Sequence, residues 1–203
     1  MTSQKIIQQG AEAVIFLEKN NIIKKRIKKS YRIPELDQKI RKLRTRSETK
    51  LLNKAGEIIF SPKVIKSDEK EKKIIMEFID GKKLSDNLDN FPKQKQIEIC
   101  KKIGKSIAKI HEKEIIHGDL TTSNMILKEG KVYFIDFGLG FISKKFEDKA
   151  VDLHLLKQAL EAKHFKNWKE LFKAVENAYK KSKNAKIVLE RLKAVEKRGR
   201  YKH

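Results

Sequence analysis

The sequence predicts an α+β fold of two lobes, the first rich in strands and the second rich in helices. Three observations predict it. Short stretches of alternating polarity fill much of residues 1–79, helical spacing dominates residues 80–203, and a hairpin pattern lies within the second part. A chain of 203 residues with 39% hydrophobic content suits two small lobes that share a cleft.

The first lobe, residues 1–79, is expected to be an antiparallel sheet with one long helix. Strands are predicted at residues 6–9, 14–17, 22–27, 63–67 and 73–79. A helix is predicted from Pro34, near its first turn, to just before Gly56. Its inner face is expected to consist of Leu36, Ile40, Leu43, Ser47 and Leu51.

The second lobe, residues 80–203, is expected to be mainly helical. A short helix is predicted at 84–88, a hairpin at 125–138, and helices from about Ala150 onward. Pro92 begins a longer helix, whose buried side is expected to be Ile97, Cys100, Gly104, Ile107 and His111. His111 is expected to be a hydrogen-bonded core residue.

The chain is strongly basic, with 49 Lys and Arg against 27 Asp and Glu and a net charge of +22. Basic clusters lie at residues 24–32, 39–46 and 197–203. Such a charge favours RNA or DNA as a partner, although a heavily solvated surface would also carry it. Cys100 is the single cysteine, which excludes an internal disulfide and fits a cytoplasmic location. No apolar run is long enough to span a membrane, so no membrane partner is expected.

The stretch IIHGDLTTSN at residues 115–124 carries the first catalytic motif. Asp119 and Asn124 have the D-x-x-x-x-N spacing of a phosphoryl-transfer loop, and Asp136-Phe137-Gly138 follows after a predicted hairpin. Each motif alone also occurs in ordinary turns. Together they predict that an acidic residue, Asp119, lies beside two oxygen ligands for Mg²⁺, Asn124 and Asp136.

A cation for the nucleotide phosphates is expected from the first lobe. Lys24 lies on a predicted strand, and strand alternation places it toward the cleft if Ile23 points into the core. Lys25 is the rival residue. Glu48 in the following helix is the expected carboxylate partner of this lysine.

The sequence resembles the protein-kinase superfamily, and more closely the small atypical kinase subunit of the KEOPS complex, the p53-related protein kinase family. The motifs that carry the resemblance are GAEA (10–13), IIKKRIKKSYRIPELD (22–37), RTRSE (44–48), IIHGDLTTSN (115–124), IDFGLG (135–140), EDKAVDLHLLKQAL (147–160) and KRGRY (197–201). The resemblance implies a two-lobed minimal protein-kinase-like fold that binds ATP and Mg²⁺. It also implies action in threonylcarbamoyladenosine modification of tRNA, beside the subunit that transfers the threonylcarbamoyl group.

Carried over by motif position, the resemblance implies catalytic roles for Asp119, Lys24 and Glu48, with Asn124 and Asp136 binding Mg²⁺. Adenine would pair with the backbone of Glu77 and Ile79 at the hinge between the lobes. The nucleotide-covering turn would consist of Gln9, Gly10, Ala11, Glu12 and Ala13. Ordinary kinases have three glycines there and this turn has one, so nucleotide cover should differ, and Glu12 either acts in the site or stabilises the turn.

Two further departures from ordinary protein kinases bear on control and substrate. Gly118 stands where many kinases have an arginine that reads a phosphorylated activation loop, so such control is not expected. Pro92 is the last proline, so the Ala-Pro-Glu motif that ends the usual activation segment is absent. Asp152 is expected to bond the backbone of the catalytic loop, or otherwise to cap a helix.

The leading interpretation is an atypical, non-specific serine/threonine protein kinase with ATPase activity that works in the KEOPS complex on tRNA. The alternative is a small-molecule phosphotransferase of the aminoglycoside or choline kinase type. The chain is short for the helical substrate insert of those enzymes, and its charge would repel cationic aminoglycosides. An inactive scaffold is disfavoured because the nucleotide and metal residues are all retained. The phosphoacceptor and the basic cluster that contacts tRNA stay open.

Overall fold

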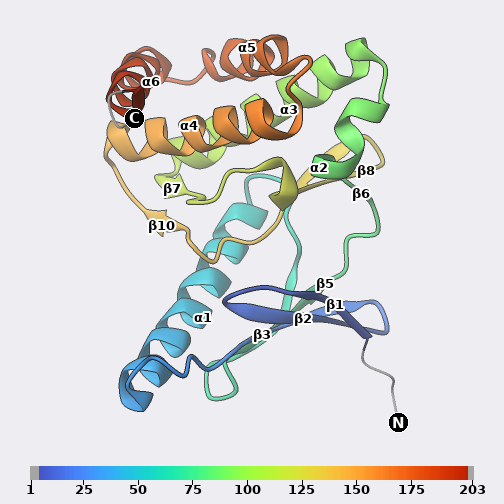
Figure 1. Cartoon of the computed structure of the whole chain (residues 1–203), viewed down its shortest axis with the longest axis vertical. Helices are drawn as coiled ribbons and strands as arrows, with labels where there is room; N and C mark the ends of the chain where they lie inside the picture. The colour runs from blue at the N-terminus through green and yellow to red at the C-terminus, as the bar shows by residue number, and fades with distance from the viewer. Residues whose placement is uncertain (1–4, 201–203) are drawn as a thin grey trace.

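The structure is a computed structural model that describes residues 5–200, with the side chains of residues 199 and 200 left undescribed. Figure 1 shows two lobes stacked along the long axis of the molecule. The lobe at the bottom holds an antiparallel sheet and one long helix, and the lobe at the top is mainly helical. The predicted α+β, two-lobed fold is confirmed.

The first lobe is built on a five-stranded sheet with the strand order β1-β2-β3-β5-β4. All neighbouring strands in it run antiparallel. The strands are β1 (Lys5–Gln9), β2 (Ala13–Glu18), β3 (Asn21–Arg26), β4 (Val64–Asp68) and β5 (Lys73–Glu77). The central position of β3 matters for the site, because both of its edges are paired and its side chains are therefore fixed in register.

Helix α1 (Pro34–Gly56) begins at the predicted proline, but its expected inner face is wrong over most of its length, because Ser47 is exposed as well as Leu36 and Leu43. Leu36 and Leu43 are each 50% exposed, and Gly56 forms the last helical residue instead of following it. The first turns of α1 extend away from the second lobe (Figure 1). They bury polar groups instead, since Asp37 is fully buried and accepts a hydrogen bond from Arg41. The apolar face lies at Leu51, Leu52 and Ala55, among the core residues that surround the cleft.

The second lobe places two small sheets beneath a layer of helices. Its elements are β6 (Lys82–Lys83), α2 (Leu84–Asn87), η1 (Leu88–Asn90), α3 (Lys93–Glu112), β7 (Ile115–Ile116), η2 (Thr122–Asn124), β8 (Met125–Lys128), β9 (Lys131–Phe134), β10 (Phe141–Ile142), α4 (Phe146–Lys163), α5 (Trp168–Tyr179) and α6 (Ala185–Arg200). Strands β6, β8 and β9 form one sheet, and β7 pairs with β10. The hairpin of β8 and β9 returns the chain from Asn124 toward Asp136.

Helix α3 is the central helix of the second lobe, and four of its five predicted inner residues are fully enclosed. Cys100, Gly104, Ile107 and His111 are buried, whereas Ile97 is partly exposed. A Cβ atom at Gly104 would lie 2.3 Å from the carbonyl oxygen of Val175, so this glycine allows α3 and α5 to cross closely. The core is therefore set by a helix crossing that the sequence pattern did not indicate.

Several expected boundaries are corrected by the structure. Strand β9 ends at Phe134, four residues before the predicted end, because Asp136 has a φ of 62°, which a β-strand does not allow. Strand β5 ends at Glu77 and not at residue 79, and α4 begins at Phe146, before Ala150. Of the basic ending, residues 201–203 lie outside the described part of the chain.

Within residues 5–200, no helix is both long and apolar enough to cross a lipid bilayer. The long helices α1 and α3 carry many charged residues on their exposed sides.

Candidate active site

Two basic side chains of β3 share one buried carboxylate of α1. Lys24 Nζ donates to Glu48 Oε1 over 2.7 Å, and Arg26 Nη2 donates to Glu48 Oε2 over 2.5 Å. Lys24 and Arg26 are two residues apart on a strand, so they emerge on the same face. All three side chains are buried, whereas the rival residue Lys25 is exposed. The structure thus brings the predicted pair together and adds a second cation that the sequence analysis missed.

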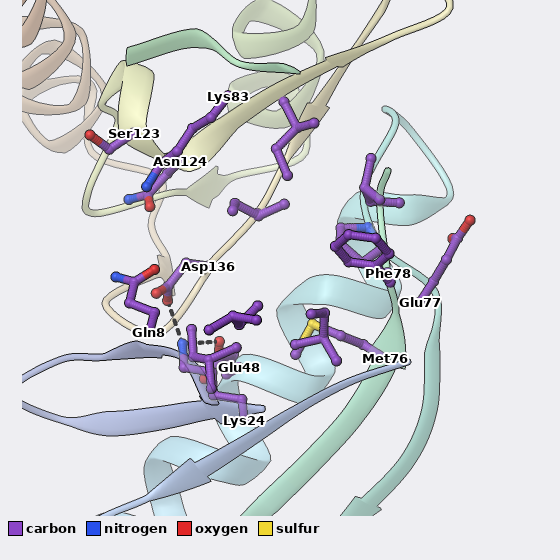
Figure 2. A pocket seen from close by; sticks show the side chains of 17 residues that line it. Gln8, Lys24, Glu48, Met76, Glu77, Phe78, Lys83, Ser123, Asn124 and Asp136 are labelled. Carbon is purple, nitrogen blue, oxygen red and sulfur yellow. Dashed lines mark hydrogen bonds and ion pairs between the residues drawn. The ribbon is translucent and has the colours of Figure 1, made fainter. Parts of the chain in front are cut away.

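Lys24 also connects the two lobes, because its Nζ donates to Asp136 Oδ1 over 2.7 Å (Figure 2). Burial lowers the pKa of Lys24, but the carboxylates of Glu48 and Asp136 outweigh burial and raise it above its ordinary value. Burial raises the pKa of Asp136, but Lys24 and the Gly138 N–H outweigh burial and lower it. Both groups are therefore charged at neutral pH.

An apolar cavity of about 260 Å³ opens beside this ion cluster, between the lobes (Figure 2). Glu77 and Ile79, the predicted hinge residues, both line it. Gln9 does not, and its neighbour Gln8 does. The remaining apolar lining comes from strands β1, β2, β3, β5 and β8 and the loops beside them: Ile7, Ile15, Ile22, Pro62, Met76, Phe78, Ile126 and Ile135. A largely apolar cavity with several polar groups in its lining suits a nucleobase.

A second cavity of about 230 Å³ continues from the first, and the two share Gln8, Ile15, Lys24 and Asp136 as lining residues. Its walls include the predicted covering turn from Gly10 to Ala13, together with Asp119. Its lining is charged and suits phosphates, whereas the apolar first cavity suits a base. The predicted site residues other than Gln9 therefore line one continuous cleft.

The catalytic-loop backbone is held by Asp152 of α4. Asp152 Oδ2 accepts the His117 N–H over 2.8 Å, and its Oδ1 accepts the Gly118 N–H over 2.9 Å. His111 lies 3.2 Å from the same carboxylate and 3.0 Å from the Tyr179 hydroxyl. The expected role of Asp152 toward the loop is confirmed, and so is the position of His111 as a hydrogen-bonded core residue.

His117 joins Asp119 to the segment that carries Asp136. Its ring is fully buried and lies 4.5 Å from the ring of Phe137. Nε2 is 3.1 Å from the Ile135 carbonyl and so carries the proton, while Nδ1 accepts the Asp119 N–H over 3.3 Å. Burial lowers the pKa of His117 despite the nearby carboxylates, which agrees with a neutral ring.

The orientation of Asn124 fits a role in holding Mg²⁺. Its Nδ2 donates to Asp119 Oδ2 over 2.8 Å and to the Asp119 carbonyl over 3.0 Å, which leaves the amide oxygen for another partner. Asn124 and Asp136 both line the first cavity (Figure 2). Among the described residues, no group of three or more His, Cys, Asp or Glu side chains could hold a metal. Two side-chain oxygens suit Mg²⁺, which usually takes its other ligands from phosphates and water.

Residues 15–141 of the chain match the RIO domain family. The chain belongs to this family. The KEOPS complex subunit Bud32 of Pyrococcus abyssi is 43% identical over 98% of this chain and 96% of its own length. A probable serine/threonine-protein kinase BUD32 homolog of Archaeoglobus fulgidus is 38% identical over 95% of this chain and 94% of its own length.

A second kind of relative is much longer than this RIO domain chain. The probable bifunctional tRNA threonylcarbamoyladenosine biosynthesis protein of Methanobrevibacter smithii is 45% identical over 98% of this chain, but over only 37% of its own length. The resemblance to the small kinase subunit of the KEOPS complex, inferred from the motifs, is confirmed.

Gly118 stands where many kinases have an arginine, and in this RIO domain chain it also has a steric role. Its φ is +79°, and a Cβ atom there would lie 2.3 Å from the carbonyl oxygen of Leu139. Any side chain at this position would therefore collide with the segment after Asp136. The loop and that segment pack backbone against backbone, which fixes Asp119 relative to Asp136.

Several lining residues were missed in the sequence analysis: Gln8, Arg26, Arg44, Lys83 and Ser123. Arg26 could have been identified from strand alternation, because it lies two positions after Lys24 on the same strand and therefore shares its face. Arg44 lies one turn before Glu48 on α1 and therefore shares its face, which was also readable. Lys83 and Ser123 depend on how the lobes face one another, and Gln8 depends on an irregularity in the register of β1; the sequence carries no local signal for either.

Lowering the pH is expected to destabilise the fold through His117. Its pKa in the folded chain lies below the ordinary value of 6.5, so below about pH 6.5 the unfolded chain binds more protons. The contribution of His117 to the free energy of unfolding should therefore be complete above pH 6.5 and fall as the pH drops toward the folded-state pKa. NMR titration of the His117 ring checks this, with an unfolded peptide of residues 113–122 as the control. A folded-state pKa at or above that of the peptide would contradict the neutral tautomer.

Proposed function

We propose that the chain is an ATP-binding atypical serine/threonine kinase with ATPase activity that acts within the KEOPS complex in threonylcarbamoyladenosine modification of tRNA. One observation carries this proposal. The Lys24–Glu48 pair, Asp136 and the Asp119–Asn124 pair meet at a continuous cleft whose base-sized end is apolar and whose other end is charged. An ordinary surface turn would not collect these groups from both lobes.

In the proposed reaction, adenine occupies the apolar cavity against the backbone of Glu77 and Ile79, and Lys24 binds the phosphates. Asn124 and Asp136 would hold Mg²⁺, which when bound neutralises charge on the phosphates. Lys24 currently donates to Asp136 Oδ1, and the second carboxylate oxygen is the one left for the metal.

Asp119 is the proposed catalytic acidic residue. The acceptor oxygen forms a bond to the γ-phosphorus, the bond from that phosphorus to the β–γ bridging oxygen breaks, and ADP leaves. Asp119 accepts the proton of the acceptor hydroxyl. A serine or threonine hydroxyl as acceptor gives a phosphoprotein, and water gives ADP and phosphate. The Asn124 Nδ2 bond keeps Oδ2 of Asp119 oriented for this role.

The partners proposed are tRNA, the threonylcarbamoyl-transferase subunit and other KEOPS subunits. The names of the relatives support this, and so does the long bifunctional relative, most of whose length lies outside the match. The net charge of +22 supports contact with a polyanion. The segment between Asp136 and α4, which begins at Phe146, is short and offers little surface for docking a peptide, so efficient phosphorylation of many protein substrates is not expected.

Replacing Asp119 with Asn is expected to lower ATP turnover by about 10²–10⁴-fold, because the proton acceptor is lost while the Asn124 bond can persist. ATP hydrolysis is measured with and without tRNA and the transferase subunit, and both should stimulate the wild-type chain. Glu170→Gln, at an exposed ion pair of α5, is the control and should leave turnover unchanged. Unchanged turnover in Asp119→Asn would contradict the catalytic role, and ADP binding by the variant shows that it is folded.

Binding of tRNA is expected to weaken steeply as salt is added, because each phosphate contact by Lys or Arg releases condensed counterions. The measurement is the dissociation constant for tRNA at a series of KCl concentrations, plotted on logarithmic axes. A slope corresponding to several ion contacts supports the proposed surface. A flat salt response would remove tRNA as a direct partner of this chain.

A further inference from the structure

The phosphate end of the cleft contains a cation that the proposed reaction does not use. Three basic side chains line the second cavity: Lys24, Arg26 and Arg44. The first two are bound to the buried carboxylate of Glu48, and the side chain of Arg26 is only 4% exposed. Arg44 differs from both because its side chain is 35% exposed and its carboxylate partner is Glu12, in the covering turn.

The contact between Arg44 and Glu12 joins α1 to the turn between β1 and β2. Arg44 Nη1 donates to Glu12 Oε2 over 2.6 Å, and both residues line the cavity. Both side chains are solvent-accessible, at 35% and 41% exposure, and such accessible ion pairs are weak and easily exchanged. Arg32 lies 3.7 Å from the other oxygen of Glu12, so this carboxylate keeps a counter-ion when Arg44 leaves it.

We propose that Arg44 binds the γ-phosphate of ATP and that Glu12 occupies Arg44 until the nucleotide enters. This inference rests on the proposed nucleotide site. A guanidinium fork suits two phosphate oxygens, as it suits the carboxylate that it now contacts. The second cavity begins at Lys24 and Asp136 and reaches Arg44, so it continues from the end of the base-sized cavity where the last phosphate belongs. Arg44 thereby supplies part of the phosphate contact that the covering turn makes less closely, because its single glycine gives its backbone less room to approach a phosphate.

The same geometry assigns Glu12 a regulatory part. Its carboxylate lines the phosphate end and repels a phosphate there unless a cation neutralises it. Exchange of Arg44 from Glu12 to the phosphate also releases the covering turn from α1. Arg44 of the first lobe should therefore increase the affinity for nucleotides with three phosphates over the affinity for those with one or two.

The test measures binding of AMP, ADP and the non-hydrolysable ATP analogue AMP-PNP to the full chain by calorimetry with Mg²⁺. Arg44→Ala is expected to weaken AMP-PNP binding by about ten- to a hundredfold, the size of a charge-assisted hydrogen bond, and to leave AMP and ADP binding unchanged. Arg44→Lys should recover part of the loss. Glu12→Gln should strengthen AMP-PNP binding, because it frees Arg44 and removes the repelling carboxylate.

Arg46→Ala is the matched control, since Arg46 lies on the same helix, pairs with Glu69 over 2.7 Å and does not line the cavity. It should bind all three nucleotides like the wild type. If Arg44→Ala and Glu12→Gln both weakened the binding of AMP, ADP and AMP-PNP by the same factor, the ion pair would have only a structural role, and the inference would be overturned. If Arg44→Ala bound AMP-PNP with wild-type affinity, the inference about Arg44 would be overturned and the proposed function would stand. If the wild-type chain bound no nucleotide, both the inference and the proposed function would be overturned.

Discussion

One buried carboxylate, Glu48 of α1, organises the cleft between the two lobes. It accepts hydrogen bonds from two cations of β3, Lys24 and Arg26, and all three groups are removed from water. Removal of one partner from a buried ion pair typically costs about 3–5 kcal/mol, because the remaining charge stays unpaired. Helix α1 therefore has one favourable position against the sheet, and that position presents Lys24 to the cleft.

The second lobe is fixed to this cluster through Asp136, which also binds Lys24. The position of Asp136 depends in turn on backbone contacts. Neutral His117 donates to the Ile135 carbonyl, Gly118 allows the segment after Asp136 to lie close, and Asp152 accepts the N–H groups of the loop. These contacts to the backbone thus fix the positions of the acidic and amide side chains of the site. A substitution at His117, Gly118 or Asp152 would therefore displace those side chains without altering them directly.

Much of this arrangement could be predicted from the sequence, because motif spacing and strand alternation are local properties. Motif spacing predicts that Asp119, Asn124 and Asp136 lie together, and alternation on β3 places Lys24, and not Lys25, toward the cleft. The expected inner face of α1 is wrong at Leu36, Leu43 and Ser47, because the buried side of the helix carries polar residues such as Thr45 and Glu48. Spacing indicates which residues share a face of a helix, but not whether another element covers that face. The first turns of α1 extend away from the second lobe and bury Asp37, while Leu36 is exposed.

Other parts of the site required the three-dimensional structure. The end of β9 depends on the positive φ of Asp136, which has no signal in a sequence that otherwise reads as a strand. Gln8 replaced Gln9 at the cavity because the register of β1 contains an irregularity between Ile6 and Gln8. The pairing of Arg44 with Glu12 joins residues 32 positions apart, and only the packing of α1 against the covering turn brings them together.

The most direct test of the shared-carboxylate account is a double-mutant cycle on Lys24 and Glu48, followed by urea unfolding. Glu48→Gln and Lys24→Met should each destabilise the fold, and the double variant should lose less than the sum, with a coupling of at least about 1 kcal/mol. Lys25→Met, at the exposed neighbouring position, is the control and should be additive with Glu48→Gln. Additive effects of Lys24→Met and Glu48→Gln would contradict the claim that this carboxylate organises the cleft.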